Sequence, residues 1–298
     1  MIHKTLPILF LLMLFGFTSH AQEDWCATDE MLEQYLNASP ENRAQFELQQ
    51  QQLSELGKNL RRNKSNTKYI IPMVVHVMHD NGIGNISKQQ IEDGIAILNR
   101  DLMAQNSDTN MIRSIFKPYL DTFNIEFRLA RIDPNGNCTE GITRTSTKLT
   151  HSANPRNQIK AIKRWPADKY FNVWLVNSIS AGQGTQGTVL GYAQFPGTGP
   201  INTFGIVVRH DQWGTIETAQ GADGRTITHE VGHCLSLLHT FQSGCGSSCQ
   251  NSGDYVCDTP PALQATWGCN KNHNSCTNDQ MGFSPYTSNV PDMLENYM

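Results

Sequence analysis

The sequence predicts an α+β fold with a mixed sheet, because helical and strand patterns follow one another after Lys68 in no repeating order. A β-branched run at Ile70–Met78 predicts a buried strand, and Ser87 with Gln90 forms the capping pair of a helix. With 38% hydrophobic and 17% charged residues in 298, we expect a soluble globular protein with a sizeable core. The net charge of −4 argues against a nucleic-acid partner.

Shorter patterns predict the other elements of residues 68–298. Apolar and polar residues alternate over Phe123–Leu129, which predicts a half-buried strand. No internal repeat is visible, so both an α+β domain and a mixed three-layer domain fit the order of elements. The remaining expected elements are a short helix at Gln158–Trp165, strands at Tyr170–Val176 and Phe204–Arg209, and a loop region at Ser178–Pro200.

Residues 1–21 have the features of a secretory signal peptide. Lys4 supplies a positive charge, Leu6–Phe17 is an apolar run of twelve residues, and small residues precede a cleavage point before Gln22. The alternative is a membrane anchor, for which the apolar run is short. We therefore expect a protein secreted to the extracellular space or periplasm, with no membrane partner after cleavage.

Residues 22–67 are predicted to form a separate prosegment. Ser39 and Pro40 favour the start of a helix, which is expected to continue to about Leu60 with a polar sequence. A basic, polar stretch follows, and such a stretch is a poor core element and a good protease target. The alternative is an ordinary helical arm with a linker. The expected activation cleavage residues are Arg61, Arg62 and Lys64.

The segment Thr228–Phe241 carries the main chemical signal. His229 and His233 are four residues apart, so a helix places both imidazoles on one face, where they can bind one Zn²⁺ at about 2.0–2.1 Å. Glu230 stands where a zinc peptidase needs its general base. The alternative is a chance occurrence of this short motif in a helix.

A third histidine, His239, extends this motif. It can reach the same metal only if the helix ends between the second and third histidines, which the extended pattern achieves with a glycine. Ser236 occupies the glycine position here, and a left-handed serine costs about 1–2 kcal/mol. Three histidines leave a fourth coordination position for water, as a catalytic zinc requires.

Residues 242–298 are rich in Gly, Ser, Asn, Asp and Pro, so a core there needs cross-links. Five cysteines fall in this region, and together with a signal peptide they indicate disulfides. Five is an odd number, so Cys138 or Cys234 could complete the pairing. The alternative, a structural zinc, lacks the usual C-x₂-C pair. The disulfide candidates are Cys245, Cys249, Cys257, Cys269 and Cys276.

On these residues the sequence resembles the metzincin metallopeptidases, and within them the cytophagalysin-like branch of the pappalysins. The resemblance implies a metzincin-like zincin catalytic domain over residues 68–298, with an active-site helix and a disulfide-stapled, irregular C-terminal subdomain. It implies a secreted zinc-dependent endopeptidase, made as a latent zymogen, that cleaves proteins or peptides before Arg or Lys. Five further stretches carry the likeness: Ile70–Val77, Gly191–Gly197, Gly205–Thr215, Asp254–Pro261 and Glu295–Met298.

The resemblance also implies roles for residues outside the motif. Met298 matches the methionine of a tight turn below the zinc ligands. The chain stops before the Asp-Tyr that continues this turn in the family, so the C-terminal subdomain is expected to be truncated. Asp254 and Asp258 match a loop that binds structural calcium in the family. An extended substrate is expected beside the strand Phe204–Arg209.

Cys26 lies early in the prosegment, in a sequence that resembles the family's inhibitory motif Arg-x-Cys-Gly-Thr and departs from it at Ala27. A thiolate binds zinc at about 2.3 Å and can take the place of water, so the resemblance implies latency through this cysteine. The alternatives are a disulfide to Cys138 or another cysteine, and an idle thiol.

Two other functions stay open at this point. One is a catalytically silent secreted binding module on a metallopeptidase fold, since fold alone does not give function. The other is a zinc hydrolase that acts on non-peptide amides. The intact Glu230 and the three histidines favour the peptidase.

Overall fold

The structure is a computed structural model that describes residues 26–60, 67–182, 187–250, 253–266 and 268–298. The predicted signal peptide and the basic residues Arg61, Arg62 and Lys64 lie outside these ranges. None of the helices in the described ranges has the length and apolar character that a bilayer span requires.

The described residues form a mixed sheet in the order β2-β1-β4-β6-β5, with β3 also paired to β1. Strand β5 runs antiparallel to β6, and the other pairs are parallel. The predicted mixed sheet is therefore confirmed, but the sequence did not predict β3 and β5. The strands are β1 (Tyr69–His79), β2 (Ile125–Leu129), β3 (Ile142–Ser146), β4 (Phe171–Val176), β5 (Gly191–Ala193) and β6 (Ile206–Arg209).

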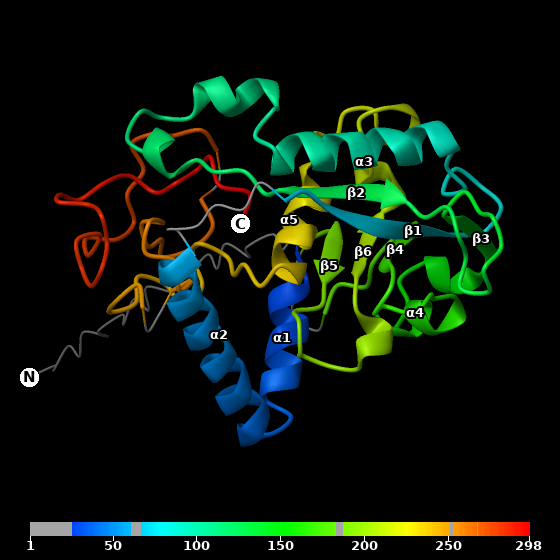
Figure 1. Cartoon of the computed structure of the whole chain (residues 1–298), viewed down its shortest axis with the longest axis horizontal. Coiled ribbons are helices and arrows are strands. Elements are labelled where there is room, and N and C mark those ends of the chain that lie inside the picture. Colours follow the sequence, from blue (N-terminus) through cyan, green and yellow to red (C-terminus); the bar gives the residue numbers. More distant parts are fainter. Residues whose placement is uncertain (1–25, 61–66, 183–186, 251–252, 267) are drawn as a thin grey trace, which may run out of the picture.

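The sheet is the middle of three layers, because its strands bury side chains on both faces (Figure 1). In β4, Val173 and Leu175 pack on one face against α3 (Lys88–Leu102) and α5 (Arg225–Cys234). Trp174 and Val176 point to the other face, where α4 (Gln158–Ile162) lies. Burial on both faces explains why these strands are near-continuous apolar runs. The Ser87 hydroxyl accepts from Gln90 N at 3.0 Å, as the capping pair predicted.

Two N-terminal helices, α1 (Thr28–Leu36) and α2 (Pro40–Leu60), form a hairpin beside α5 and β5 (Figure 1). The hairpin is held by a small apolar cluster that joins its helices to the main domain. The sequence predicted α2, whose start is capped by Ser39. It missed α1, which is short and follows Ala27 without a side-chain cap. The cluster residues are Leu32, Leu36, Phe46, Phe195 and Leu238.

Short 3₁₀ helices connect the main elements, and each has five residues or fewer. They are η1 (Ser107–Met111), η2 (Lys117–Tyr119), η3 (Lys148–Thr150), η4 (Ile201–Thr203), η5 (His210–Gln212) and η6 (Glu217–Ala219).

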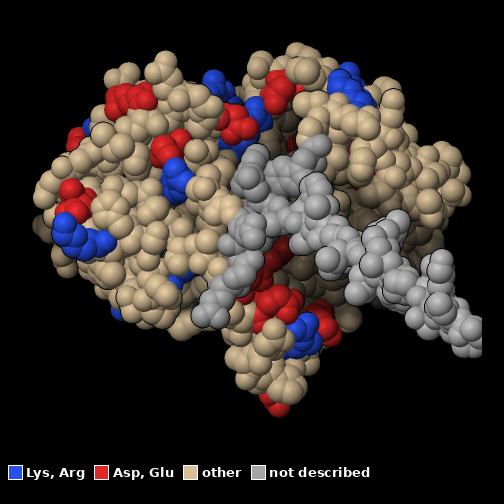
Figure 2. Space-filling view, turned by 180° about the vertical axis from the view of Figure 1, so that it is seen from behind, with Lys and Arg blue, Asp and Glu red and all other residues tan. Residues whose placement is uncertain are grey.

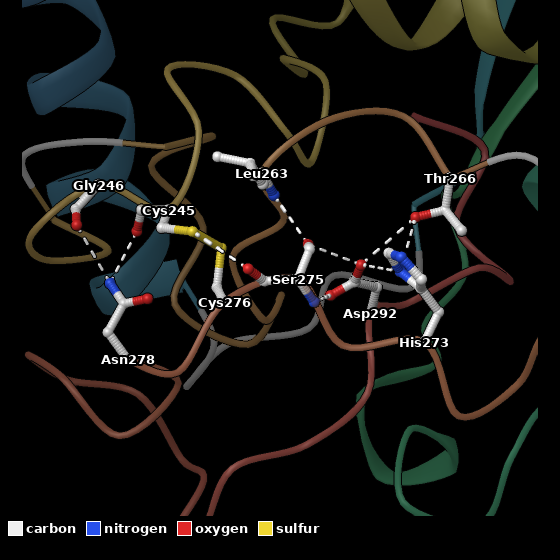
Figure 3. Close-up of a disulfide and its surroundings, with 9 residues drawn as sticks. All are labelled: Cys245, Gly246, Leu263, Thr266, His273, Ser275, Cys276, Asn278 and Asp292. Atoms are coloured by element: carbon white, nitrogen blue, oxygen red, sulfur yellow. Dashed lines mark hydrogen bonds and ion pairs between the residues drawn. A yellow bond between two sulfur atoms is a disulfide. The ribbon is translucent and has the colours of Figure 1, made fainter.

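The described part of residues 242–298 contains no helix or strand and is held by covalent and polar links. Disulfides join Cys245 to Cys276 and Cys249 to Cys257. Figure 3 shows the first of these beside Asp292, a buried carboxylate that accepts from the backbone N and the hydroxyl of Ser275 at 3.0 and 2.8 Å. These links replace regular secondary structure as the framework of this region.

The pairing prediction was wrong for Cys269, which is exposed and free. Neither thiol expected to complete the pairing does so: Cys138 is exposed and unpaired, and Cys234 is buried inside α5. The region is also tied to the main domain, where Arg113 makes a bidentate ion pair with Glu295 at 2.7 Å for each bond.

Candidate metal centre

Helix α5 and the turn after it bring three histidines to one point. His229 and His233 lie one turn apart on the helix, and the chain then reverses so that His239 returns to them. The reversal is made at Ser236, whose φ is +72°, in the left-handed region. Leu237 N donates to Gly232 O at 3.0 Å and closes the end of the helix. Serine therefore adopts the conformation for which the extended motif uses glycine.

Each histidine is oriented by an acceptor on its Nδ1 atom. His229 Nδ1 lies 2.5 Å from Tyr297 O, and His233 Nδ1 lies 2.8 Å from Leu237 O. His239 Nδ1 lies 2.8 Å from a carboxylate oxygen of Asp29. Because each acceptor fixes a proton on Nδ1, Nε2 is the atom that each imidazole can offer to a metal ion in its neutral form. Against the effect of burial, the hydrogen bond to Asp29 raises the pKa of His239 to about 9, so metal binding at this histidine displaces a proton.

The three Nε2 atoms converge with the Cys26 thiol. His229 Nε2 is 3.2 Å from His233 Nε2 and 3.1 Å from His239 Nε2, and Cys26 Sγ is 3.5 Å from His233 Nε2. A tetrahedral zinc with bonds of about 2.0–2.1 Å separates two nitrogen ligands by roughly 3.3 Å. All four ligand atoms lie within 4.8 Å of one another. Three imidazole nitrogens and a thiol that converge at these distances are a donor set that zinc prefers, so these residues fit a zinc ion.

Burial controls the charges around this centre. Burial and the neighbouring imidazoles hold the pKa of His233 well below its usual value, which keeps this histidine neutral. Burial also raises the pKa of the Cys26 thiol to about 12. A thiolate therefore forms at this position only with a cation beside it, because metal ligation deprotonates a cysteine.

Glu230 is fully buried between α5 and β5. Its Oε2 accepts from the Thr28 hydroxyl at 2.9 Å, while Oε1 has no hydrogen-bond partner among the described residues. Burial raises the pKa of Glu230 above its ordinary value, which suits a group that must accept and release a proton. A Cβ at Gly191 would lie 2.8 Å from Oε1, so glycine leaves the space in front of this carboxylate.

Residues 26–28 lie along the free edge of β5. Ala27 N donates to Gly191 O at 3.1 Å, and the Thr28 hydroxyl accepts from Ala193 N at 2.8 Å. The expectation of a substrate beside Phe204–Arg209 was wrong, because β6 is flanked by β4 and β5 and has no free edge. The sheet edge beside the histidine helix α5 is that of β5.

Met298 lies beneath the helix that carries the histidines. Its Sδ atom occupies the space beside Gly232, where an added Cβ would be 2.4 Å from the sulfur. The neighbouring backbone oxygen, Tyr297 O, accepts the hydrogen bond from His229 Nδ1. The terminal residues therefore form a floor under the histidine cluster.

The two aspartates expected to bind calcium lie in one loop. Asp254 Oδ1 accepts from Val256 N at 2.9 Å. Burial and the negative charge of Asp258 raise the pKa of Asp254 to about 7. In the described residues, the only cluster of three or more His, Cys, Asp or Glu side chains with converging ligand atoms is the one at Cys26.

Sequence reasoning missed two residues of this centre, Thr28 and Asp29. Thr28 matches the threonine of the inhibitory motif, so that signal was present. Asp29 belongs to an acidic stretch whose sequence resembles that of an exposed segment. Only its contact with His239 shows that it belongs to this centre.

Comparisons with known proteins agree with this geometry. A family model described as "Pregnancy-associated plasma protein-A", a peptidase family, matches residues 154–297. The structure of a promirolysin mutant from Tannerella forsythia is 31% identical, with a TM-score of 0.70, over 91% of this chain and 85% of that one.

This chain belongs to the pappalysin family of metallopeptidases.

Other pappalysin relatives give the same assignment. Mature mirolysin from Tannerella forsythia, solved in complex with a cleaved peptide, is 35% identical with a TM-score of 0.65, over 78% of this chain and 84% of that one. An extracellular metalloprotease from Verticillium alfalfae is 30% identical over 72% of this chain. The match covers 61% of the Verticillium protein's length. The metzincin-like fold and the family predicted from the sequence are thus confirmed.

Proposed function

We propose that this pappalysin is a secreted zinc-dependent endopeptidase with a signal peptide at residues 1–21, a prosegment at 22–67 and a catalytic domain at 68–298. The convergence of three histidine Nε2 atoms beside the buried carboxylate of Glu230 carries this proposal. His229, His233 and His239 would hold the zinc, with Met298 below them. Acidic and basic residues are interspersed on the face of the molecule that Figure 2 shows.

The roles of the protein's own residues follow from their positions. Zinc, when bound, supplies a Lewis acid that makes water a nucleophile near neutral pH and polarises the scissile carbonyl. Glu230 takes a proton from the attacking water and gives it to the leaving amine. The edge groups Gly191 O and Ala193 N bind the backbone of an extended peptide substrate. From the family resemblance, we further propose cleavage before Arg or Lys.

We also propose that the prosegment keeps the precursor latent. Cys26 Sγ lies at the position of a fourth ligand, and Thr28 covers the general base. The free state of Cys26 supports this reading against a disulfide to Cys138. Cutting near Arg61, Arg62 and Lys64 would end latency by separating residues 26–28 from the catalytic domain.

Calcium binding at Asp254 and Asp258 is a further proposal, supported by the two carboxylates in one loop. Calorimetric titration with Ca²⁺ should show binding that is lost in Asp254→Asn.

The test of the main proposal combines metal content with proteolysis. We expect one zinc per chain by mass spectrometry, cleavage of a denatured protein substrate that stops on addition of a chelator, and a loss of several orders of magnitude in Glu230→Ala with its zinc retained. Glu140→Ala, at an exposed glutamate, is the control. Zinc binding without any cleavage by the cut protein would instead indicate a silent binding module.

The same assay tests latency when it is applied to the uncut precursor. Cys26→Ala should be active before processing, and Cys138→Ala, at an exposed free thiol, should stay latent. An uncut Cys26→Ala protein as silent as its parent would show that the prosegment blocks the site by bulk alone.

A further inference from the structure

We propose that Arg156 forms a subsite for an acidic side chain of the substrate, which Glu30 of the prosegment occupies in the precursor. The inference rests on the proposed peptidase function and adds a substrate class to it. Arg156 lies outside the metal centre and was not singled out by any sequence motif.

The guanidinium of Arg156 is fixed in an orientation that binds a carboxylate, and we call it the carboxylate receptor. Its Nη2 donates to Glu30 Oε2 at 2.7 Å, and its Nε donates to Ser180 O at 2.7 Å, which fixes the plane of the group. Arg156 is only 8% exposed. At Gly182, an added Cβ would lie 2.3 Å from both carboxylate oxygens of Glu30, so this glycine leaves room for a carboxylate.

The receptor lies next to the edge that binds an extended chain. Arg156 and Tyr192 line one small cavity, and Tyr192 sits between the two β5 residues that hold Ala27 and Thr28. The Tyr192 hydroxyl is buried and has no hydrogen-bond partner among the described residues. A chain that occupies the β5 edge can reach the guanidinium, as Glu30 does two residues after Thr28.

The prosegment stands in for substrate at this place. Residues 26–28 use the edge groups of β5, and Glu30 follows two residues later on α1. Its carboxylate has the same chemistry as the side chain of a substrate Asp or Glu. Figure 1 shows α1 beside β5. Because Glu30 on α1 pairs with Arg156, and Ala27 and Thr28 bond to β5, removal of this segment frees the guanidinium and the strand edge together.

Loss of the prosegment leaves this guanidinium without its charge partner. Within the described ranges Glu30 is its only ion-pair partner, and the sequence Gln-Gly-Thr-Gln at 183–186 contains no carboxylate. Once α1 has left, the guanidinium is open to a new carboxylate, with which it can form charge-assisted hydrogen bonds. A substrate carboxylate restores the pair, whereas a glutamine of the same shape does not.

The experiment measures cleavage of matched peptides by precursor that has been cut in the basic stretch. The two peptides of each pair differ only in carrying Glu or Gln at one position, and each position around the scissile bond is tested in turn. We expect at least tenfold higher kcat/KM for Glu at one position. Arg156→Gln should reduce that ratio to within twofold of one, Arg156→Lys should retain part of it, and Arg156→Glu should favour Lys at that position. Arg164→Gln, at an exposed arginine, should keep the parent ratio. Equal cleavage of every Glu and Gln pair by the parent overturns the subsite.

A binding assay separates this inference from the peptidase proposal. A synthetic peptide of residues 24–36 should bind cut Glu230→Ala protein at least tenfold more tightly than its Glu30→Gln form, and the difference should disappear when Arg156→Gln is added. If the parent cleaves no substrate, the peptidase proposal fails while this ratio still tests the receptor. Equal binding of both peptides overturns the receptor.

Discussion

Thr28, the first residue of α1, contacts the buried carboxylate of Glu230, and its replacement by valine gives a measurable prediction. The side chain is 1% exposed and its hydroxyl makes two hydrogen bonds, to Glu230 Oε2 at 2.9 Å and from Ala193 N at 2.8 Å. Valine has nearly the same shape, so the Thr28→Val variant keeps the packing and leaves both buried partners unpaired.

The size of the effect follows from those two bonds. A hydrogen bond to a charged group contributes about 1.5–3 kcal/mol and a neutral one about 0.5–1.5 kcal/mol, so the docked prosegment should lose about 3 kcal/mol. Each 1.4 kcal/mol is a factor of ten, so the population with α1 detached should rise roughly a hundredfold. The change should be local to the hairpin of α1 and α2.

Hydrogen exchange measures this population directly. With chelator present to prevent self-cleavage, amides of α1 in the Thr28→Val precursor should exchange about a hundredfold faster than in the parent, at unchanged protection of β1. Thr28→Ser keeps the hydroxyl and should exchange within about tenfold of the parent, because it loses only a methyl group. Exchange of α1 in Thr28→Val within twofold of the parent would refute the reasoning.

Two further predictions concern stability. Ser236→Gly should relieve the left-handed serine by about 1 kcal/mol and raise the melting temperature by roughly 2–4 °C, whereas Ser236→Ala should give no gain. Burial, together with the charge of Lys163, lowers the pKa of His76 to about 4 from 6.5. The unfolded chain therefore binds a proton that the folded protein does not, and stability should fall by about 3 kcal/mol as pH drops from about 6.5 to 4. Urea midpoints across this range should show a shallower fall in His76→Gln; parallel curves would contradict the assignment.

Elements with a strong local pattern could be predicted from the sequence. The β-branched run of β1 and the Ser87 cap of α3 depend on residues close in the chain, and so does the histidine spacing on α5. Strand β5 has three residues in a Gly-rich stretch and exists through its pairing with β6, which no local pattern contains. The sequence therefore predicted that the three histidines come together, but it assigned the edge for an extended chain to the wrong strand.

The remaining misses have the same origin. Cys269 belongs to a cysteine-rich stretch, and only the three-dimensional arrangement of the thiols decides which of them pair. Arg156 is an unremarkable residue in a loop, and its burial against Glu30, 126 positions earlier in the chain, is a tertiary contact. Long-range contacts of this kind decide which residues surround a catalytic group.

Under the proposed latency, the position of residues 26–28 on the β5 edge makes the N-terminal segment a tethered competitor of substrate. While the chain is intact, a covalent tether maintains an effective concentration that reaches the millimolar range for short flexible linkers. Cleavage between the hairpin and the catalytic domain leaves the hydrogen bonds of Ala27 and Thr28 to β5 intact. It lowers the effective concentration of the inhibiting segment to the concentration of the released peptide in solution. Activation is then governed by dilution as well as by cleavage. Freshly cut protein kept concentrated would regain inhibition from its own peptide, and the same protein released into a large volume would not.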